Sequence, residues 1–450
     1  MGLSKGLQKT NEWNITTVTH LLSRTLFGYT QEDIDFALSK TLDDFVDNFL
    51  LADKPTPQNP GFWVDDPSTS NLTERSYELT FWWLNLMLTQ GYSFREKMVL
   101  FWHNHFVSEL SVVKLPQRMY WQNKLFRDYA FGNFKELTKK VTVDPAMLYY
   151  LDGRKNTKQD PNENYARELM ELFTIGIGNY SENDIVEAAR ALTGWQVDGL
   201  TSYFDKDRHD ETSKTFMGQT GNFDYNNIID ILFSKEEVSK FICRKLYKEF
   251  VYFEPNESNI AELAQIFRDN NYELKPVLSV LLKSVMFYDP ETYGAKIKSP
   301  VEFLTTVVKQ FKIEHPDYDY LRKTANQLAQ TLFAPPNVAG WKGDKTWVST
   351  TTLPARHVFS DKIIDGQKSD LDIIKYARTY SSSEDAEKFV DDIIQVFLQF
   401  PLSNNRRQFL LDTLLDGAAV YDWSTSNENA DKRLESFFKA LLRLSEYQLS

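Results

Sequence analysis

Residues 163–175 read ENYARELMELFTI and form the clearest helical pattern in the chain. With 3.6 residues per turn, the apolar side chains fall on one arc of this helix and the polar ones on the opposite arc. The apolar arc holds Tyr165, Ala166, Leu169, Met170, Leu172 and Phe173. The pattern predicts an amphipathic helix whose apolar side is packed against a core.

Similar signals recur along the chain and favour a mainly α-helical, multi-helical globular protein. Helices are expected to begin at Thr30 and Ser181, where a capping side chain precedes an acidic first turn, and at Ser93, where Glu96 completes a capping box. The expected helices span 17–27, 31–51, 73–90, 94–107, 115–131, 133–142, 163–175, 182–193, 226–233, 235–250, 257–269, 274–286 and 299–312. Gly and Pro together are rare, 18 and 16 of 450 residues, which is typical of long helices with few tight turns.

Two stretches break the helical pattern. Residues 194–224 are polar, contain glycines and alternate locally, which predicts a small β-hairpin or an irregular insertion near 195–222. Residues 333–341 contain two adjacent prolines, which cannot continue a helix. We expect a helical core over residues 12–357 that includes the insertion, and a smaller helical C-terminal region over residues 358–450.

Composition and charge exclude several classes of function. The net charge of −12 argues against non-specific nucleic-acid binding, which needs Lys and Arg to neutralise phosphates. No run of about 18 apolar residues is present, so no membrane span is expected. The first residues lack the apolar segment of a secretory signal, which predicts a cytoplasmic protein. A single cysteine, Cys243, excludes an internal disulfide and a cysteine-based zinc site.

Common catalytic motifs are absent from the sequence. There is no Gly-x-x-x-x-Gly-Lys-Ser/Thr phosphate loop, no Gly-x-Gly-x-x-Gly, no Gly-x-Ser-x-Gly and no His-Glu-x-x-His. These absences disfavour a standard NTPase, a Rossmann dehydrogenase, an α/β-hydrolase and a zincin.

The polar arc of the 163–175 helix is a candidate catalytic surface. It presents Asn164, Arg167, Glu168 and Glu171, and two carboxylates three residues apart could share a proton or a cation. The simpler interpretation is a solvated helix face, with Glu163 and Arg167 as an ordinary surface pair. Amphipathicity alone favours the solvated face.

Residues 102–106 read WHNHF and place two histidines in a helix that is apolar all round. Such a helix is buried, so His103 and His105 need partners inside the protein. They are candidate metal ligands, although positions i and i+2 point to nearly opposite sides of a continuous helix. A hydrogen-bonded core histidine is an equally good interpretation of each.

Two further polar clusters are candidates for binding. His209 and Asp210 lie in the irregular insertion and are candidate metal ligands, with Lys214 close behind them as a substrate-binding residue. His20 and Arg24 lie four residues apart on a helix and form either an exposed pair or, through Arg24, part of a substrate site.

Taken together, these segments resemble a bacterial family catalogued as domain of unknown function 1800. The resemblance covers about residues 15–357 and excludes 358–450, where no motif matches. It is carried by the segments 20–28, 101–106, 144–153, 161–169, 191–195, 209–210, 214–218, 298–300 and 336–341. Through these motifs, Trp195, Asn337 and Trp341 join the candidate substrate-binding residues. Members of the family are often encoded beside a sulfatase-like or phosphatase-like family, domain of unknown function 1501, which the resemblance implies as a partner, and many are exported.

Two functions from different classes remain open. In the first, the histidine helix, the Asn-Glu-x-x-x-Arg-Glu helix and the His-Asp loop converge on one cleft and hold a divalent metal that activates water. The substrate would then be a glycan or a phosphate or sulfate ester, since the many aromatic side chains can stack on sugars. In the second, the polar motifs form a structural network in a non-catalytic binding or assembly partner of the sulfatase-like protein. The sequence does not decide whether the protein is an enzyme.

Overall fold

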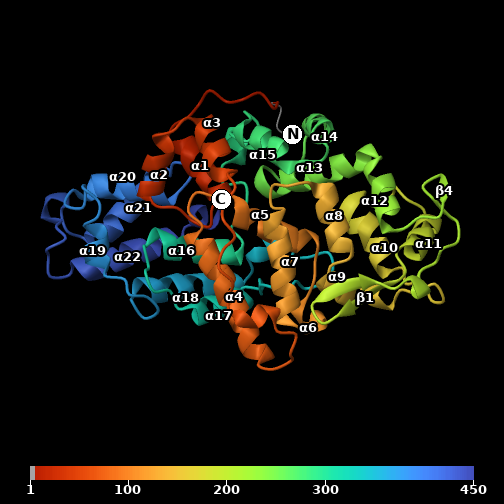
Figure 1. The fold of residues 1–450 in the computed structure, drawn as a ribbon. Helices are drawn as coiled ribbons and strands as arrows, with labels where there is room; N and C mark the ends of the chain where they lie inside the picture. Colours follow the sequence, from red (N-terminus) through yellow and green to blue (C-terminus); the bar gives the residue numbers. More distant parts are fainter. Residues whose placement is uncertain (1–5) are drawn as a thin grey trace.

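The computed structural model describes residues 6–450, and these fold mainly as α-helices, as predicted. Figure 1 shows an elongated body in which the chain crosses the centre repeatedly, with the last helices at one end and the strands at the other. The first seven helices are α1 (Ile15–Thr25), α2 (Gln31–Leu38), α3 (Leu42–Phe45), α4 (Leu72–Thr89), α5 (Arg95–His105), α6 (Leu110–Val113) and α7 (Pro116–Asp128).

The middle of the chain supplies the helices that surround the strands and the upper centre of the body in Figure 1. They are α8 (Phe134–Thr142), α9 (Pro145–Tyr150), α10 (Asn164–Glu168), α11 (Glu182–Ala191), α12 (Tyr225–Phe233), α13 (Glu236–Phe250), α14 (Glu257–Asp269) and α15 (Leu274–Lys283). The last third supplies α16 (Pro300–Gln310), α17 (Tyr318–Gln327), α18 (Thr352–Ile364), α19 (Ile373–Ala377), α20 (Ala386–Phe397), α21 (Asn404–Leu415) and α22 (Ala430–Arg443). Within residues 6–450, no helix is long and apolar enough to cross a membrane.

The predicted helix at 163–175 is present, but its second half is wound more loosely than an α-helix. After α10 the chain continues as a π-helix from Leu169 to Thr174. The amides of Ile175 and Gly176 both donate to the carbonyl of Met170, at 3.1 and 2.9 Å. Most of the predicted apolar arc is buried as expected, with Leu172 only partly so. Wider turns of this kind are rare and often lie at functional sites.

Two of the three predicted helix starts are confirmed, and one is wrong. Thr30 and Ser181 each form a capping box with the acidic residue three positions later. Ser93 forms none, because α5 begins one residue later than predicted and Glu96 is buried. The Glu96 carboxylate accepts hydrogen bonds from Trp83 Nε1 at 3.0 Å and from Nε and Nη2 of Arg127 at 2.7 Å each. Glu96 therefore forms a buried bidentate ion pair with Arg127 instead of the predicted capping box with Ser93.

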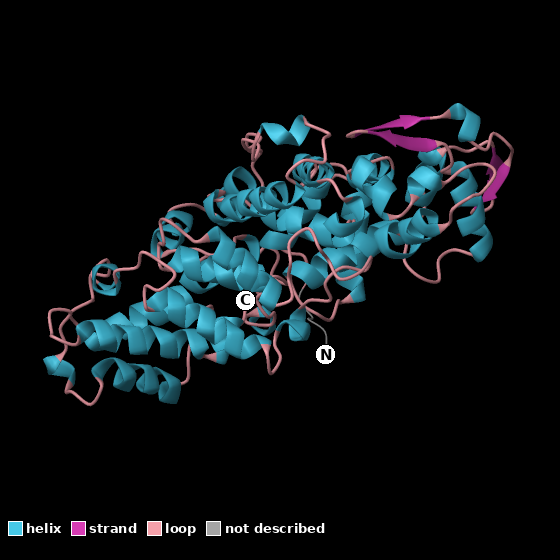
Figure 2. Ribbon diagram, turned by 90° about the horizontal axis from the view of Figure 1, so that it is seen from below, coloured by secondary structure: helices cyan, strands magenta, loops and turns pink. Residues whose placement is uncertain are grey.

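The predicted insertion contains two antiparallel hairpins instead of one. The first pairs β1 (Trp195–Asp198) with β2 (Thr201–Phe204), and the second pairs β3 (Lys214–Phe216) with β4 (Gln219–Gly221). Figure 2 shows both at one extremity of the helical body. A short 3-10 helix, Lys206–Arg208, lies between the two hairpins, whereas the second predicted break, at 333–341, contains no helix and forms turns.

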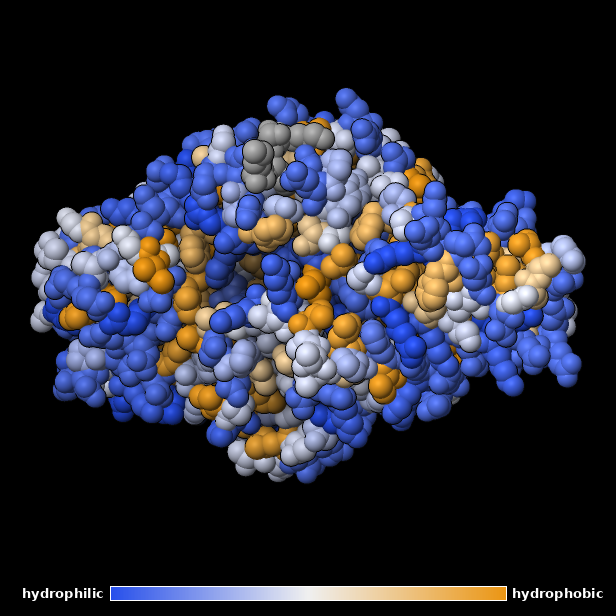
Figure 3. Space-filling model, turned by 180° about the vertical axis from the view of Figure 1, so that it is seen from behind, coloured by the Kyte–Doolittle hydropathy of each residue, from blue (hydrophilic) through white to orange (hydrophobic). Residues whose placement is uncertain are grey.

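One hydrophobic core runs through the whole described chain, from Leu7 to Tyr447. The C-terminal helices join it directly, and the last residues return to the centre of the molecule. There Ile297 pairs with Leu449, and the amide of Lys298 donates to the carbonyl of Gln448 at 2.9 Å. Figure 3 shows that hydrophilic side chains cover most of the face seen from behind, with smaller hydrophobic groups between them.

Candidate functional site

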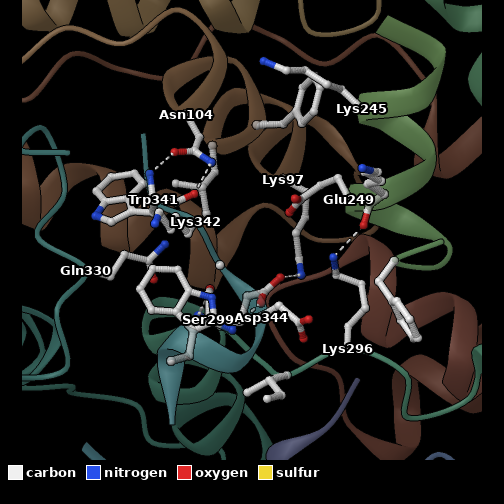
Figure 4. A pocket seen from close by; sticks show the side chains of 18 of the residues that line it. Lys97, Asn104, Lys245, Glu249, Lys296, Ser299, Gln330, Trp341, Lys342 and Asp344 are labelled. Atoms are coloured by element: carbon white, nitrogen blue, oxygen red, sulfur yellow. Dashed lines mark hydrogen bonds and ion pairs between the residues drawn. The ribbon is translucent and has the colours of Figure 1, made fainter. Parts of the chain in front are cut away.

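A pocket with a cavity volume of about 430 Å³ lies between α5, α13, the start of α16 and two connecting segments. The segments are residues 295–299 and 339–344, so parts of the chain more than two hundred positions apart meet here. Figure 4 shows the side chains reaching into it from all of these elements. Its volume is within the range of sites for small organic ligands.

Charged side chains dominate the polar part of the wall. Five lysines and three carboxylates line the pocket: Lys97, Lys245, Lys248, Lys296, Lys342, Glu249, Glu302 and Asp344. This local excess of positive charge contrasts with the net charge of −12 for the whole chain. Concave sites lined by one sign of charge attract ligands of the opposite sign.

One lysine and one carboxylate neutralise each other at the floor of the pocket. Lys97, on α5, forms an ion pair with Glu302, on α16, and only 5% of the Lys97 side chain is exposed. Burial opposes ionisation of Glu302, but the charge of Lys97 and hydrogen bonds from Lys97 and Ser299 lower the pKa of Glu302 to about 2. The pair therefore stays ionised and contributes no net charge to the pocket.

More cations lie buried behind Glu302. Arg24, Lys298 and Arg356 all act electrostatically on it, and Glu302 in turn raises the pKa of each. Burial outweighs this effect and lowers the pKa of Lys298 to about 7 and those of Arg24 and Arg356 to about 10. Since one carboxylate faces several buried cations, the protein behind the floor is electropositive.

His105 and Lys245 form a hydrogen-bonded pair at one side of the pocket. His105 Nε2–H donates to the carbonyl of Phe173 at 2.9 Å, so His105 Nδ1 is the acceptor for Lys245 Nζ, also at 2.9 Å. Lys245 Nζ donates a second bond to the carbonyl of Leu172 at 2.9 Å. Burial, together with the charge of Lys245, lowers the pKa of His105 well below its ordinary value and keeps the ring neutral. Burial also lowers the pKa of Lys245 to about 8.

These bonds use two of the three N–H groups of the Lys245 ammonium. An ammonium group has three donors, and two of them have the partners just described. The Leu172 carbonyl, which accepts from Lys245, and the Phe173 carbonyl, which accepts from His105, both belong to the π-helical turns of the 163–175 helix. The loose winding thus places two backbone carbonyls against the wall of the pocket.

Lys296 enters the pocket from the opposite side. Its Nζ donates to the carbonyl of Lys248 on α13 at 2.7 Å, as drawn in Figure 4. Its backbone pairs with Ser450: the Ser450 amide donates to the Lys296 carbonyl at 2.7 Å, and the Lys296 amide donates to the Ser450 carbonyl at 3.2 Å. The C-terminal segment therefore holds this lysine in place. Burial lowers the pKa of Lys296, and the negative charge of Glu249 opposes that shift.

Asn104 fixes the aromatic wall of the pocket. Its Oδ1 accepts the Trp341 amide at 2.7 Å, and its Nδ2 donates to the Trp341 carbonyl at 3.2 Å. The preceding Gly340 has φ +78°, and a Cβ there would lie 2.2 Å from Asn104 Oδ1. Only glycine permits this close approach. Trp341, Trp347, Phe101 and Phe253 supply aromatic surface, with Phe253 half exposed.

The predicted catalytic residues lie elsewhere, on the face of α10 and the π-helix that points away from the core. Arg167 forms ion pairs with Glu163 at 3.3 Å and Glu182 at 2.9 Å, and Glu171 accepts from Tyr180 Oη at 3.1 Å. Burial, reinforced by Glu171, raises the pKa of Glu168. The backbone amide of Asn164 donates to Asn162 Oδ1 at 2.9 Å. None of these four candidates lines the 430 Å³ pocket.

The predicted ligands and binding residues of the insertion hold the hairpins together. His209 Nδ1 lies 3.0 Å from the Thr193 carbonyl, and Asp210 Oδ2 accepts from Arg190 Nε at 2.8 Å. Lys214 Nζ donates to the carbonyl of Thr212 at 3.0 Å and to that of Asp210. The Trp195 ring packs against Phe204 and Tyr225.

The remaining predicted residues lie in the pocket, in the core and at the surface. His105 and Trp341 line the pocket, whereas His103 is buried against the rings of Trp83, Phe333 and Trp341. Burial lowers the pKa of His103 to about 3. Asn337 is exposed and its Oδ1 accepts the Ala339 amide at 2.9 Å.

The first helix differs from the expectation of an exposed pair, since His20 and Arg24 are both buried. His20 Nε2 lies 3.0 Å from the Phe287 carbonyl, and Arg24 Nη2 donates to the Thr292 carbonyl at 2.5 Å. The predicted motifs do not converge on this pocket, because His105 lines it whereas neither the α10 face nor the His209-Asp210 cluster does. Across residues 6–450, no group of three or more His, Cys, Asp or Glu is placed to hold a metal ion.

The pocket lysines were not among the predicted residues. Lys245 and Lys248 lie three positions apart on one face of α13, a pattern that in sequence is typical of a solvated surface. The Lys298-Ser299-Pro300 motif did mark the neighbourhood of Lys296, but it gave no reason to single out that residue.

Comparison with known proteins gives one match. The model of a family described as Protein of unknown function (DUF1800) matches residues 20–449. The match extends through the C-terminal helices, beyond the motifs recognised in the sequence. No curated protein and no solved structure matches the chain.

Proposed function

The chain belongs to the DUF1800 family of proteins of unknown function, and we propose that its central pocket binds a sugar-sized molecule carrying a phosphate or sulfate ester. The observation that carries the proposal is the combination of five lysines with aromatic side chains around one cavity. Ammonium groups recognise the ester oxygens, and aromatic rings contact the less polar faces of the attached ring.

The partners of the lysines support an anionic ligand. Only Lys97 has a carboxylate partner among the pocket residues, whereas Lys245 is held by a neutral imidazole and a carbonyl and Lys296 by a carbonyl. These two ammonium groups keep their charge uncompensated by their direct partners. An anion entering the pocket gains attraction without having to displace an existing ion pair.

The aromatic side of the pocket supports a ring-shaped ligand. Asn104 holds the backbone of Trp341, and the indole packs against the His103 ring with 5.7 Å between ring centroids, so the side chain does not need to be ordered when a ligand binds. Such preorganisation reduces the entropic cost of association. Trp341 lies across the pocket from Lys245 and Lys296 in Figure 4, so an indole and the two ammonium groups line the cavity from different sides.

Isothermal titration calorimetry with glucose 6-phosphate, glucose 6-sulfate and glucose tests the proposal. We expect the two esters to bind and glucose to bind far more weakly. Lys342→Gln removes a pocket lysine, and Lys345→Gln removes an exposed lysine three residues later that does not line the pocket. Weaker ester binding in Lys342→Gln alone supports the assignment, and equal effects of the two substitutions contradict it.

The sequence also led to two more specific predictions, hydrolysis of the ester and association with a sulfatase-like protein. The same mixtures test the first, by measuring phosphate or sulfate release with and without added zinc, manganese or calcium. Release that depends on the protein and is lost in Lys342→Gln would extend binding to catalysis. Ester binding without release would favour the non-catalytic alternative.

A further inference from the structure

The pocket geometry points to a dianionic ester group, a phosphate monoester in preference to a sulfate monoester, held between α13 and Lys296. This inference rests on the proposed function and specifies the ligand. It follows from the balance of charges around the cavity and from the ammonium groups whose N–H donors are not all used in hydrogen bonds within the protein.

The charge of the lining residues is best matched by two negative charges. Five ammonium groups face three carboxylates, so the lining carries two positive charges in excess. A phosphate monoester at pH 7 carries between about 1.5 and 2 negative charges, because its second pKa is about 6. A sulfate monoester carries one charge at every pH in this range and leaves one ammonium uncompensated.

The ammonium groups with free donors lie on two elements. Lys245 has one N–H left after its two hydrogen bonds, and Lys296 has two left after its bond to the Lys248 carbonyl. Lys248 is exposed on the same face of α13 as Lys245. The terminal oxygens of a phosphate ester are strong acceptors for ammonium donors of this kind.

The protein behind the pocket strengthens the preference for the higher charge. Glu302 is already neutralised by Lys97, yet Arg24 and Arg356, whose pKa values stay near 10, also act on it from the buried side. Their field reaches the cavity through low-dielectric protein, where charges are screened less than in water. A dianion gains twice as much from such a field as a monoanion does.

The preference can be recognised by its dependence on pH. The charged and titratable groups that face the ligand come from five segments: Lys97 and His105 on α5, Lys245, Lys248 and Glu249 on α13, Lys296 from the segment 295–299, Glu302 on α16, and Lys342 and Asp344 on the loop. Between pH 5 and 7.5 burial keeps His105 neutral, while Lys245 and Lys298, whose pKa values burial lowers to about 8 and about 7, lose part of their charge toward pH 7.5. Both esters feel that loss, but only the phosphate group gains a second negative charge over the same interval. The affinity for the phosphate ester relative to that for the sulfate ester should therefore rise from pH 5 to pH 7.5.

Calorimetric titrations of the full chain with glucose 6-phosphate and glucose 6-sulfate at pH 7.5 and pH 5 test the inference. At pH 7.5 the phosphate ester should bind about fivefold more tightly, a difference of about 1 kcal/mol. At pH 5 the two esters should bind alike. Lys248→Gln should weaken binding of the phosphate ester more than that of the sulfate ester, while Lys345→Gln should change neither.

The possible outcomes separate this inference from the proposed function. If neither ester binds, the proposed function fails and the ligand assignment fails with it. If both bind equally at both pH values, the pocket binds esters but the preference for a dianion is wrong. If the phosphate ester binds more tightly but Lys248→Gln and Lys345→Gln have equal effects, the binding site is not the one assigned here.

Discussion

The carboxamide of Asn104 holds the backbone of Trp341 at both of its polar ends, across 237 positions of sequence. Asn104 Oδ1 accepts the Trp341 amide at 2.7 Å, and Asn104 Nδ2 donates to the Trp341 carbonyl at 3.2 Å. Through this pair the buried helix α5 fixes the loop that forms the aromatic side of the pocket. Two segments that were singled out in the sequence for separate reasons thus act as one structural unit.

Replacement of Asn104 by alanine should destabilise the protein and loosen the aromatic wall. Two hydrogen bonds are lost and the Trp341 backbone groups are left without these partners, which should lower the free energy of unfolding by about 1–3 kcal/mol. Urea unfolding followed by tryptophan fluorescence measures the change. Asn183→Ala, at an exposed position of α11, is the matched control and should have little effect. Equal stability of the two variants would show that the Asn104 contact contributes nothing.

Replacement of Gly340 by alanine should be much more damaging than the same change at another left-handed glycine. A Cβ at Gly340 would lie 2.2 Å from Asn104 Oδ1 and 2.7 Å from the Asn104 carbonyl oxygen, whereas a Cβ at Gly417 meets nothing within 4 Å. The two glycines have similar φ angles, +78° and +81°. Gly417→Ala should therefore cost only the backbone penalty of about 1–2 kcal/mol, and Gly340→Ala several times that.

The double variant Asn104→Ala/Gly340→Ala separates the two sources of the clash at Gly340. Removing the Asn104 side chain relieves the contact at 2.2 Å but leaves the backbone contact at 2.7 Å, so rescue should be partial. Thermal unfolding of the four variants gives the comparison. Full rescue would show that the whole clash comes from the Asn104 side chain. Equal stability of Gly340→Ala and Gly417→Ala would contradict the close contact between Gly340 and Asn104.

The helices could be predicted from the sequence because their signals are local. The caps at Thr30 and Ser181 and the apolar arc of residues 163–175 depend on neighbours within a few positions, and the structure confirms them. The cap at Ser93 failed because Glu96 has a stronger partner in Arg127, which lies on another helix. Long-range pairing of this kind leaves no trace in local periodicity.

The candidate site was only partly predictable for the same reason. His105 and Trp341 were selected because their motifs are unusual, and both line the pocket. The lysines were not, because a surface lysine and a pocket lysine have the same local sequence pattern. Lys245 and Lys296 become site residues only through tertiary contacts with the π-helical carbonyls and with the returning C-terminal segment.

His103 should make the protein less stable in acid. Its folded-state pKa is lowered by burial to about 3, so the folded protein keeps the ring neutral while the unfolded chain binds a proton below its ordinary pKa of 6.5. The unfolded state thus binds more protons between pH 6.5 and 3, and stability falls as the pH falls through this window. The loss attributable to His103 is on the order of 3–5 kcal/mol at the acid end.

His103→Phe removes this proton uptake and keeps an aromatic ring against Trp83 and Phe333. Urea unfolding at pH 7 and pH 4 should show a smaller loss of stability in the variant than in the wild type. Some loss should remain, because burial also lowers the pKa values of His20 and His105. His315→Gln, at an exposed position, should leave the loss as in the wild type. An unchanged pH dependence in His103→Phe would contradict the assignment.

The cluster in the insertion should prove structural, and Arg190 is the residue that tests this. Its guanidinium donates to Asp210 Oδ2 at 2.8 Å, to Glu187 Oε1 at 2.7 Å and to the Ser213 carbonyl at 3.2 Å, so it ties the second hairpin to α11. Arg190→Gln should increase amide hydrogen exchange over residues 209–221 while ester binding at the pocket stays unchanged. Arg244→Gln, which removes an exposed ion pair with Glu257, is the control and should leave exchange in the insertion as it was. Loss of ester binding in Arg190→Gln, while the rest of the protein stays protected from exchange, would contradict a purely structural role. That result would make the insertion part of the functional site, as the sequence motifs suggested.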